Sequence, residues 1–118
     1  MPEDPKTVDL RADYEVGTDD VKLTVVIGNA QIGSSIIKLN GTEKGRGTIK
    51  NLEMGSGPNI KGRAIKTKSV VTDVNDQTNK TTITYKLSGG KRPQEFTSSG
   101  TVDQDGDSII YRAMFKLI

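Results

Sequence analysis

The sequence predicts an all-β domain of about eight antiparallel strands, and three observations lead to that prediction. Valine, isoleucine and threonine number 9, 11 and 13, against 6 leucines and 4 alanines. Branching at Cβ restricts a side chain against a helical turn but suits a pleated sheet. Apolar and polar residues alternate along most of the chain, as in half-buried strands, and no long segment carries the helical period.

The alternating segments are separated by Gly, Asn and Asp residues, which favour turns. The last of them, 109–117, is expected to bury its odd-numbered residues. The long segment 60–74 changes phase between Ile65 and Val70, which predicts a bulge near residues 66–68, and a further irregularity is expected near Gly33. The eight expected strands cover residues 8–16, 21–27, 31–39, 48–54, 60–74, 81–87, 95–102 and 109–117.

Eight strands with short turns fit either a two-sheet β-sandwich (immunoglobulin-like) or a closed up-and-down barrel. The connections near Gly17, Asn75 and Asp105 have the residues of tight hairpins, which suit both architectures. The longer links 40–47 and 55–59 are where a strand could cross from one sheet to another. The sandwich is therefore favoured over the barrel.

The length of 118 residues corresponds to one domain. We expect residues 1–6 to form a polar tether and residues 7–118 to form a single β domain. No apolar stretch is long enough for a membrane span. The net charge of +2 predicts neither a polyanionic partner nor nucleic-acid binding.

The residue types exclude the common forms of enzyme chemistry. The chain contains neither His nor Cys, so it can build no Ser-His-Asp triad, no thiol nucleophile and no thiolate zinc site. All aromatic residues fall on positions that should face the core, which leaves none to wall a substrate pocket. They are Tyr14, Tyr85, Phe96, Tyr111 and Phe115. We expect a protein that is not an enzyme and needs no cofactor.

Asp103, Asp105 and Asp107 are weak candidates for a metal site, because carboxylates at alternate positions begin many calcium loops. The EF-hand pattern also needs Gly at its sixth position and Glu at its twelfth, where this chain has Ser108 and Met114. Asp-Gly at the apex favours a hairpin turn. We therefore interpret the segment as a hairpin without a bound ion.

A second oxygen-rich segment contains Asp73, Asn75 and Asp76. It would matter if it lay at the same end of the domain as the three aspartates. In that arrangement the two loops together could offer the oxygens that calcium requires.

Lys61, Arg63, Lys66 and Lys68 form the densest basic stretch, and Lys91–Arg92 is a shorter one. Lysines on an edge strand prevent edge-to-edge association, which is their commonest role there. We interpret the stretch as protection of an edge strand.

These observations favour a non-enzymatic binding or structural module that meets its partners at strand edges or loop ends. The polar turns and many threonines resemble those of extracytoplasmic β-domains of bacteria, which favours a periplasmic or secreted location. The alternative is a small barrel that carries an apolar ligand. An empty interior of several hundred Å³, lined by Tyr14, Tyr85, Tyr111 and Phe115, would distinguish this carrier from a module with a filled core.

Overall fold

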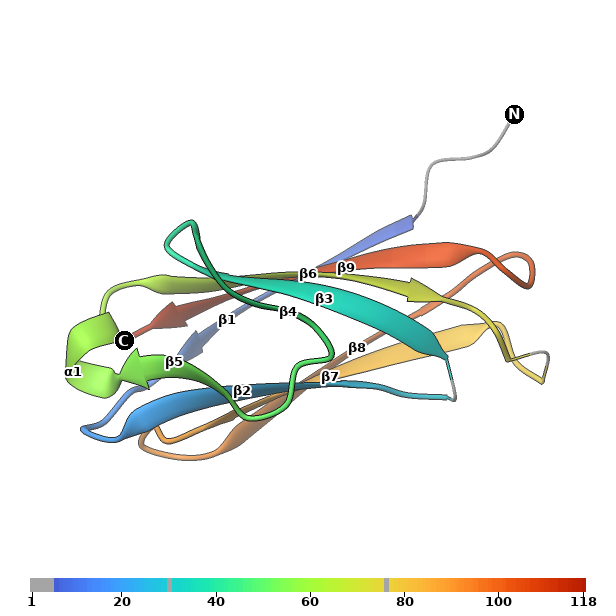
Figure 1. Cartoon of the computed structure of the whole chain (residues 1–118). Helices are drawn as coiled ribbons and strands as arrows, with labels where there is room; N and C mark the ends of the chain where they lie inside the picture. The colour runs from blue at the N-terminus through green and yellow to red at the C-terminus, as the bar shows by residue number, and fades with distance from the viewer. Residues whose placement is uncertain (1–5, 30, 76) are drawn as a thin grey trace.

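The computed structural model describes residues 6–29, 31–75 and 77–118. In this part of the chain, nine strands form two sheets that pack face to face and do not close into a barrel (Figure 1). The two-sheet β-sandwich is therefore confirmed. The elements are β1 (Lys6–Tyr14), β2 (Asp20–Ile27), β3 (Ile32–Leu39), β4 (Thr42–Gly47), β5 (Leu52–Ser56), α1 (Gly57–Ile60), β6 (Ala64–Thr72), β7 (Lys80–Ser88), β8 (Gln94–Thr101) and β9 (Ser108–Leu117).

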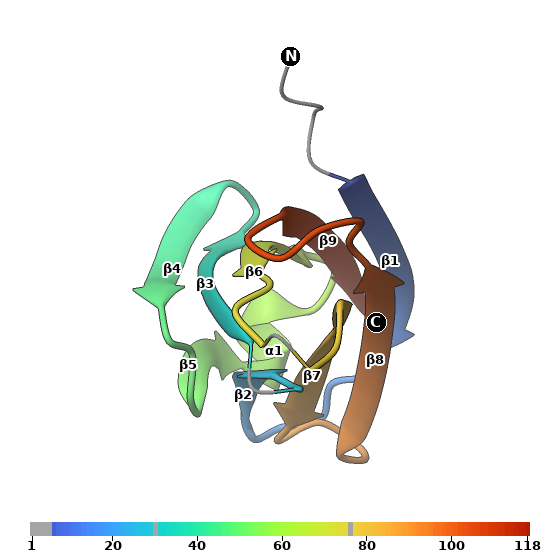
Figure 2. The ribbon, with the colours of Figure 1, turned by 90° about the vertical axis from the view of Figure 1, so that its right-hand side faces the viewer.

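The five-stranded sheet has the order β1-β9-β6-β3-β4, and the four-stranded sheet has the order β5-β2-β7-β8. Figure 2 looks along the sandwich and shows the strands arranged around the core, with β8 beside β1 and β4 beside β5. Within the described residues, no helix has the length and apolar character that crossing a bilayer requires.

The alternation of the strands builds the core between the sheets. Every odd-numbered residue of β9 from Ile109 to Leu117 is buried, as expected. Phe115 packs edge to face on Tyr85 of the opposite sheet, with 5.5 Å between ring centroids, and also contacts Phe96. The four aromatic side chains expected to line a carrier are fully buried in the hydrophobic core between the two sheets: Tyr14, Tyr85, Tyr111 and Phe115.

One pair of strands is parallel, which the expectation of antiparallel strands did not include. β1 and β9 lie side by side in register from Lys6 opposite Ile109 to Tyr14 opposite Leu117. The chain crosses to the other sheet directly after β1, so β1 pairs with the last strand and not with β2. Lys6, assigned to the tether, is the first residue of β1, and the rest of the expected tether, residues 1–5, lies outside the described residues.

The three expected hairpins, near Gly17, Asn75 and Asp105, are wrong. Each of these connections joins strands of different sheets, namely β1 to β2, β6 to β7 and β8 to β9. Consecutive strands pair only at β3–β4 and β7–β8 in the described chain. Turn residues mark where the chain reverses, but they do not say which sheet the next strand joins.

The link 40–47, expected as a loop, contains the additional strand β4. Asn40 and Gly41 have φ angles of +48° and +88°, which a two-residue hairpin turn requires. The chain crosses between sheets after β4, so the strand expected over 48–54 begins only at Leu52. The link 55–59 does carry a crossing, because α1 connects β5 to β6.

The bulge expected near residues 66–68 is absent. β6 pairs continuously with β9 from Ala64 to Thr72, and Ile65 and Val71 both face the core. Between them, the polar residues Thr67 and Ser69 face inward and are buried, while Val70 points outward and is 40% exposed. The strand therefore keeps one phase throughout, and the exposed Val70 accounts for the apparent change of phase in the sequence.

The irregularity expected near Gly33 is also misplaced. β3 pairs with β6 without interruption through residues 32–39. The register shift lies on the other side of β3, between Ile37 and Lys38, where the strand pairs with β4.

Candidate binding surface on the five-stranded sheet

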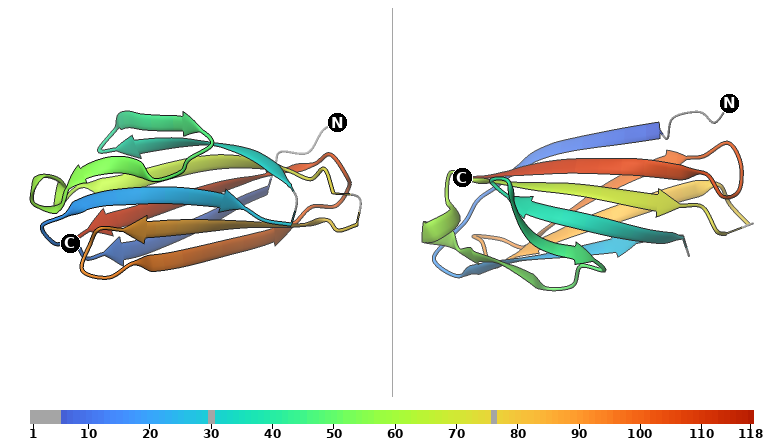
Figure 3. Two further views of the ribbon diagram at one scale, coloured as in Figure 1. Left: turned by 60° about the horizontal axis from the view of Figure 1, so that its bottom comes forward. Right: turned by 45° about the horizontal axis from the view of Figure 1, so that its top comes forward.

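Outward-facing side chains of four adjacent strands line a groove of about 580 Å³ on the outer face of the five-stranded sheet, the face turned forward in Figure 3, right. The strand register places these side chains in two rows that run across β1, β9, β6 and β3. The first row is Arg11, Met114, Lys66 and Lys38, and the second is Asp9, Arg112, Lys68 and Ile36. Leu10, Thr67 and Ala113 also border the groove, although their side chains face the core.

The groove concentrates positive charge. Its lining contains five Lys and Arg side chains and one carboxylate, a net charge of +4. The whole chain carries only +2, so all other residues together carry −2. The near-neutral composition therefore averages over regions of opposite sign, and the net charge alone does not describe this face.

The two central lysines do not lie on an edge. Lys66 and Lys68 belong to β6, which is the middle strand of the sheet and pairs with β9 on one side and β3 on the other. The interpretation of the basic stretch as edge protection is wrong for both residues. Lys61 and Arg63 lie outside strands, between α1 and β6.

Like charges lie directly opposite each other in the groove. Lys38 is paired with Lys66, and Lys68 is paired with Arg112. Like charges in such positions destabilise a sheet. The side chains of Arg11, Lys38, Lys66 and Lys68 make no hydrogen bond or ion pair with another described residue. Local conflicts of this kind are expected at functional or strained sites of a protein.

Arg112 is the one groove cation with an ion partner among the described residues. Its Nε donates to Oδ1 of Asp9 at 2.8 Å and its Nη2 donates to Oδ2 at 3.1 Å. The hydrogen bonds from Arg112 hold the pKa of Asp9 below its ordinary value, and the same bonds raise the pKa of Arg112. The carboxylate lies on β1, at the side of the groove, and leaves the lysines of β6 free.

The groove also has apolar surface. Ile36 and Met114 are half-buried and flank the lysines of β6 on either side. Beyond the second row, the same face continues with Ile110, with Val70 at 40% exposure and with Ile32 at 59%. No aromatic side chain contributes, because four of the five are fully buried and the fifth packs against the core.

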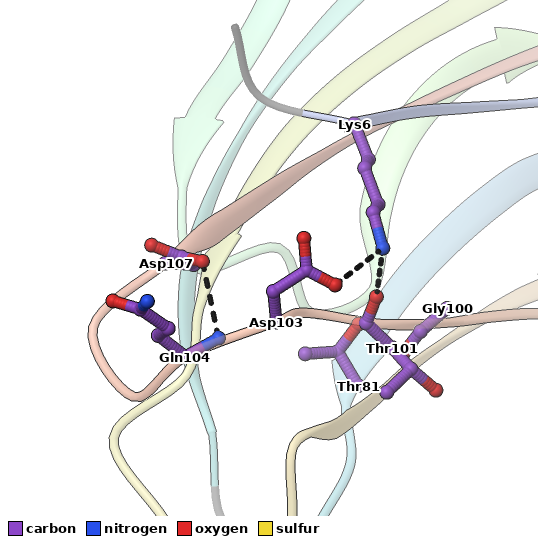
Figure 4. A network of polar contacts seen from close by, with 7 residues as sticks. All are labelled: Lys6, Thr81, Gly100, Thr101, Asp103, Gln104 and Asp107. Atoms are coloured by element: carbon purple, nitrogen blue, oxygen red, sulfur yellow. Dashed lines mark hydrogen bonds and ion pairs between the residues drawn. The ribbon is translucent and has the colours of Figure 1, made fainter. Parts of the chain in front are cut away.

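Asp103, Asp105 and Asp107 lie at the end of the domain, in the turn that joins β8 to β9. Figure 4 shows that the carboxylates of Asp103 and Asp107 make separate contacts. Asp103 forms an exposed ion pair with Lys6 at 3.4 Å, and Lys6 also donates to the Thr101 carbonyl. The Asp107 carboxylate accepts a hydrogen bond from the backbone N–H of Gln104 in the same turn. Asp103 and Asp107 are thus held by different partners.

The second oxygen-rich loop does lie at this end of the domain. Asp73 is buried and accepts hydrogen bonds from Gln31 Nε2 at 2.7 Å and from the Asn75 backbone N–H at 3.3 Å. The Asn79 amide is assigned with its nitrogen donating to Asp73 and Asp105, because its oxygen would otherwise face only acceptors. The described residues contain no group of three or more His, Cys, Asp or Glu placed to hold a metal. Asp76 lies outside the described residues.

Comparisons of this chain with models of protein families, with curated proteins and with solved structures found no match.

Proposed function

We propose that this chain is a non-enzymatic binding module that holds an acidic segment of a partner protein in the groove of the five-stranded sheet. The observation that carries the proposal is the set of five cations from four strands, in the middle of a sheet and largely without internal partners. A surface of this kind is complementary to carboxylates, which would relieve the repulsion between the paired lysines and arginine.

The non-enzymatic part of the proposal rests on the absence of His and Cys and on the environment of the carboxylates. Asp73 is the one buried carboxylate among the described residues. Its oxygens are engaged by Gln31, Asn75 and Asn79, which leaves it poorly placed to exchange a proton with a substrate. A catalytic acid or base must lie within hydrogen-bond reach of the substrate atom whose proton it transfers.

A protein segment fits this groove better than a nucleic acid or an anionic glycan. Single-stranded nucleic acids stack their bases on aromatic side chains, and no aromatic residue lines the groove. Ile36 and Met114 present apolar surface between the cations, which peptide side chains can cover. A chain that combines carboxylates with aliphatic groups matches both features.

The proposal includes an extracytoplasmic location, which is supported by the threonine-rich strands and the polar turns. Immunodetection in cell fractions tests it, and recovery with cytoplasmic markers would contradict it. We do not favour the alternative of a carrier of an apolar ligand. It required a closed barrel with an empty interior, whereas the described strands form two open sheets around packed aromatic rings such as Tyr85 and Phe115.

Titration of a fluorescein-labelled acidic peptide by fluorescence anisotropy tests the function. We expect saturable binding that weakens strongly between about 0.1 M and about 1 M salt, over which the Debye length falls from about 10 Å to about 3 Å. The double substitution Lys66→Glu with Lys68→Glu should abolish it. The matched control is Lys91→Glu with Arg92→Glu, which makes the same change of net charge in an exposed loop outside the groove.

Retained binding in the groove variant, or equal loss in the loop variant, would show that the groove is not the site. Heparin and a single-stranded oligonucleotide serve as competing probes. If either binds more tightly than the peptide and depends on Lys66 and Lys68, the partner is another polyanion and the acidic protein segment is excluded.

A further inference from the structure

We infer that the segment held in the groove is extended, runs along β6 and carries carboxylates at alternate residues. This inference rests on the proposed function and specifies its ligand. It follows from the direction in which the free cations of the groove repeat.

Lys66 and Lys68 are separated by one residue on a regular strand, so both side chains leave the same face of the sheet. Two residues of extended chain span about 6.6–6.8 Å. A partner segment in the same conformation has the same repeat. Carboxylates at its positions i and i+2 can therefore meet Lys66 and Lys68 together.

Carboxylates in adjacent positions cannot do this equally well. Successive side chains of an extended segment point to opposite faces, so in a block of two acids one points toward solvent. At equal charge and length, an alternating sequence brings more carboxylates to the groove than a blocked sequence.

The direction across the strands offers no comparable match. Neighbouring strands lie about 4.7–4.9 Å apart, which is not the side-chain repeat of an extended peptide. In the first row Met114 separates Arg11 from Lys66, and in the second row Arg112 is already bonded to Asp9. In the described groove, only β6 carries two cations without an ion partner at positions i and i+2, the spacing of side chains on one face of an extended chain.

The flanks of β6 define the rest of the ligand. Lys66 lies between Met114 and Lys38, and Lys68 lies between Arg112 and Ile36. A carboxylate above Lys66 is therefore shared with Lys38, while Met114 and Ile36 offer contacts to aliphatic carbons. Because β6 already pairs on both sides, the segment lies on the face of the sheet and is held by side chains alone.

Two labelled peptides of identical composition test the inference, one repeating Glu-Ser and the other repeating Glu-Glu-Ser-Ser. The wild-type protein should bind the alternating peptide about two- to fivefold more tightly, as one additional exposed ion pair allows. Lys68→Gln should remove this preference. Arg11→Gln, a matched neutralisation in the groove but off β6, should weaken both peptides alike and keep the preference.

Equal affinity of the wild-type protein for the two peptides overturns the inference, and so does a preference that survives Lys68→Gln. Both results leave the proposed function intact, provided that the peptides bind in a groove-dependent way. Absence of binding by either peptide contradicts the proposed function itself.

Discussion

Lys38 and Lys66 lie directly opposite each other on neighbouring antiparallel strands, so two like charges share the centre of the groove. Sheet interiors usually avoid this arrangement, because cross-strand neighbours are close enough for the repulsion to be felt. If the pair is retained for a partner, a substitution that damages binding should relieve strain in the free protein.

We therefore expect Lys66→Glu to raise the free energy of unfolding by about 0.2–1 kcal/mol, because it places a carboxylate opposite Lys38. Urea denaturation measures the change, and Lys91→Glu in the exposed loop after β7 is the control, expected to be neutral. A loss of stability in the groove variant alone would mean that the lysine side chain has a structural role.

Phe115→Ala should lower the free energy of unfolding by about 3–5 kcal/mol, since it removes a fully buried ring that contacts Tyr85 and Phe96 across the core. Lys116→Ala, on the exposed face of the same strand, should cost less than about 0.5 kcal/mol. Urea denaturation of both variants provides the measurement. Similar costs at the two positions would be incompatible with the register of β9.

Tyr85 and Tyr111 should respond differently to loss of their hydroxyl groups. The Tyr85 hydroxyl is buried without a well-formed hydrogen bond, although Thr67 lies near enough to influence it. The Tyr111 hydroxyl bonds with the Thr81 hydroxyl and donates to the Thr81 carbonyl at 3.2 Å. Tyr85→Phe should therefore be neutral or stabilising, whereas Tyr111→Phe should cost about 1–3 kcal/mol. If urea denaturation gave the same loss of stability for both variants, the two hydroxyl groups would not differ in their hydrogen bonding as described.

Stability should fall in alkaline solution through Tyr85. Burial raises the pKa of Tyr85 from 10.0 to about 12, so the unfolded chain loses this proton at lower pH than the folded protein. The contribution is fully present below about pH 10 and is lost as the pH rises through about 12. Urea midpoints measured across this range should decline less steeply in Tyr85→Phe. An unchanged slope would assign the decline to other groups, such as Tyr14 and Tyr111, whose pKa values burial also raises.

Calcium at millimolar concentration should leave the melting temperature unchanged. A calcium site needs six to eight converging oxygens, and Asp103, Asp105 and Asp107 are each held by a different neighbour. Differential scanning fluorimetry with and without calcium is the measurement. A rise of several degrees that disappears in Asp105→Asn would instead establish a metal site at this end of the domain.

The strands could be located from the sequence because burial imposes a period of two, as the odd face of β9 illustrates. The sequence does not show to which sheet a strand belongs, because the alternation of apolar and polar residues is the same whichever strand lies alongside. The connections near Gly17 and Asn75 therefore carried the residues of hairpins but join different sheets. Val70 shows the same limit, because the sequence alone does not distinguish a valine on the exposed face of a strand from a valine in the core.

Only part of the groove could be predicted from the sequence. Lys66 and Lys68 stood out as a basic stretch, but their interpretation depended on whether β6 was an edge strand. Arg11, Lys38 and Arg112 join them from positions far apart in the chain, through pairings that no local pattern encodes. The outward parity of each residue could be read from the sequence, whereas their proximity required the register.

The parallel pairing of β1 with β9 has a mechanical consequence. Lys6 and Leu117 lie at opposite ends of this pair, so tension applied to them acts along the strands and in opposite directions. The ladder between β1 and β9 is then loaded in shear, with all its hydrogen bonds resisting at once, whereas a hairpin pulled at its ends opens one bond at a time. Single-molecule stretching should show one high rupture force, lowered by Leu10→Pro within β1.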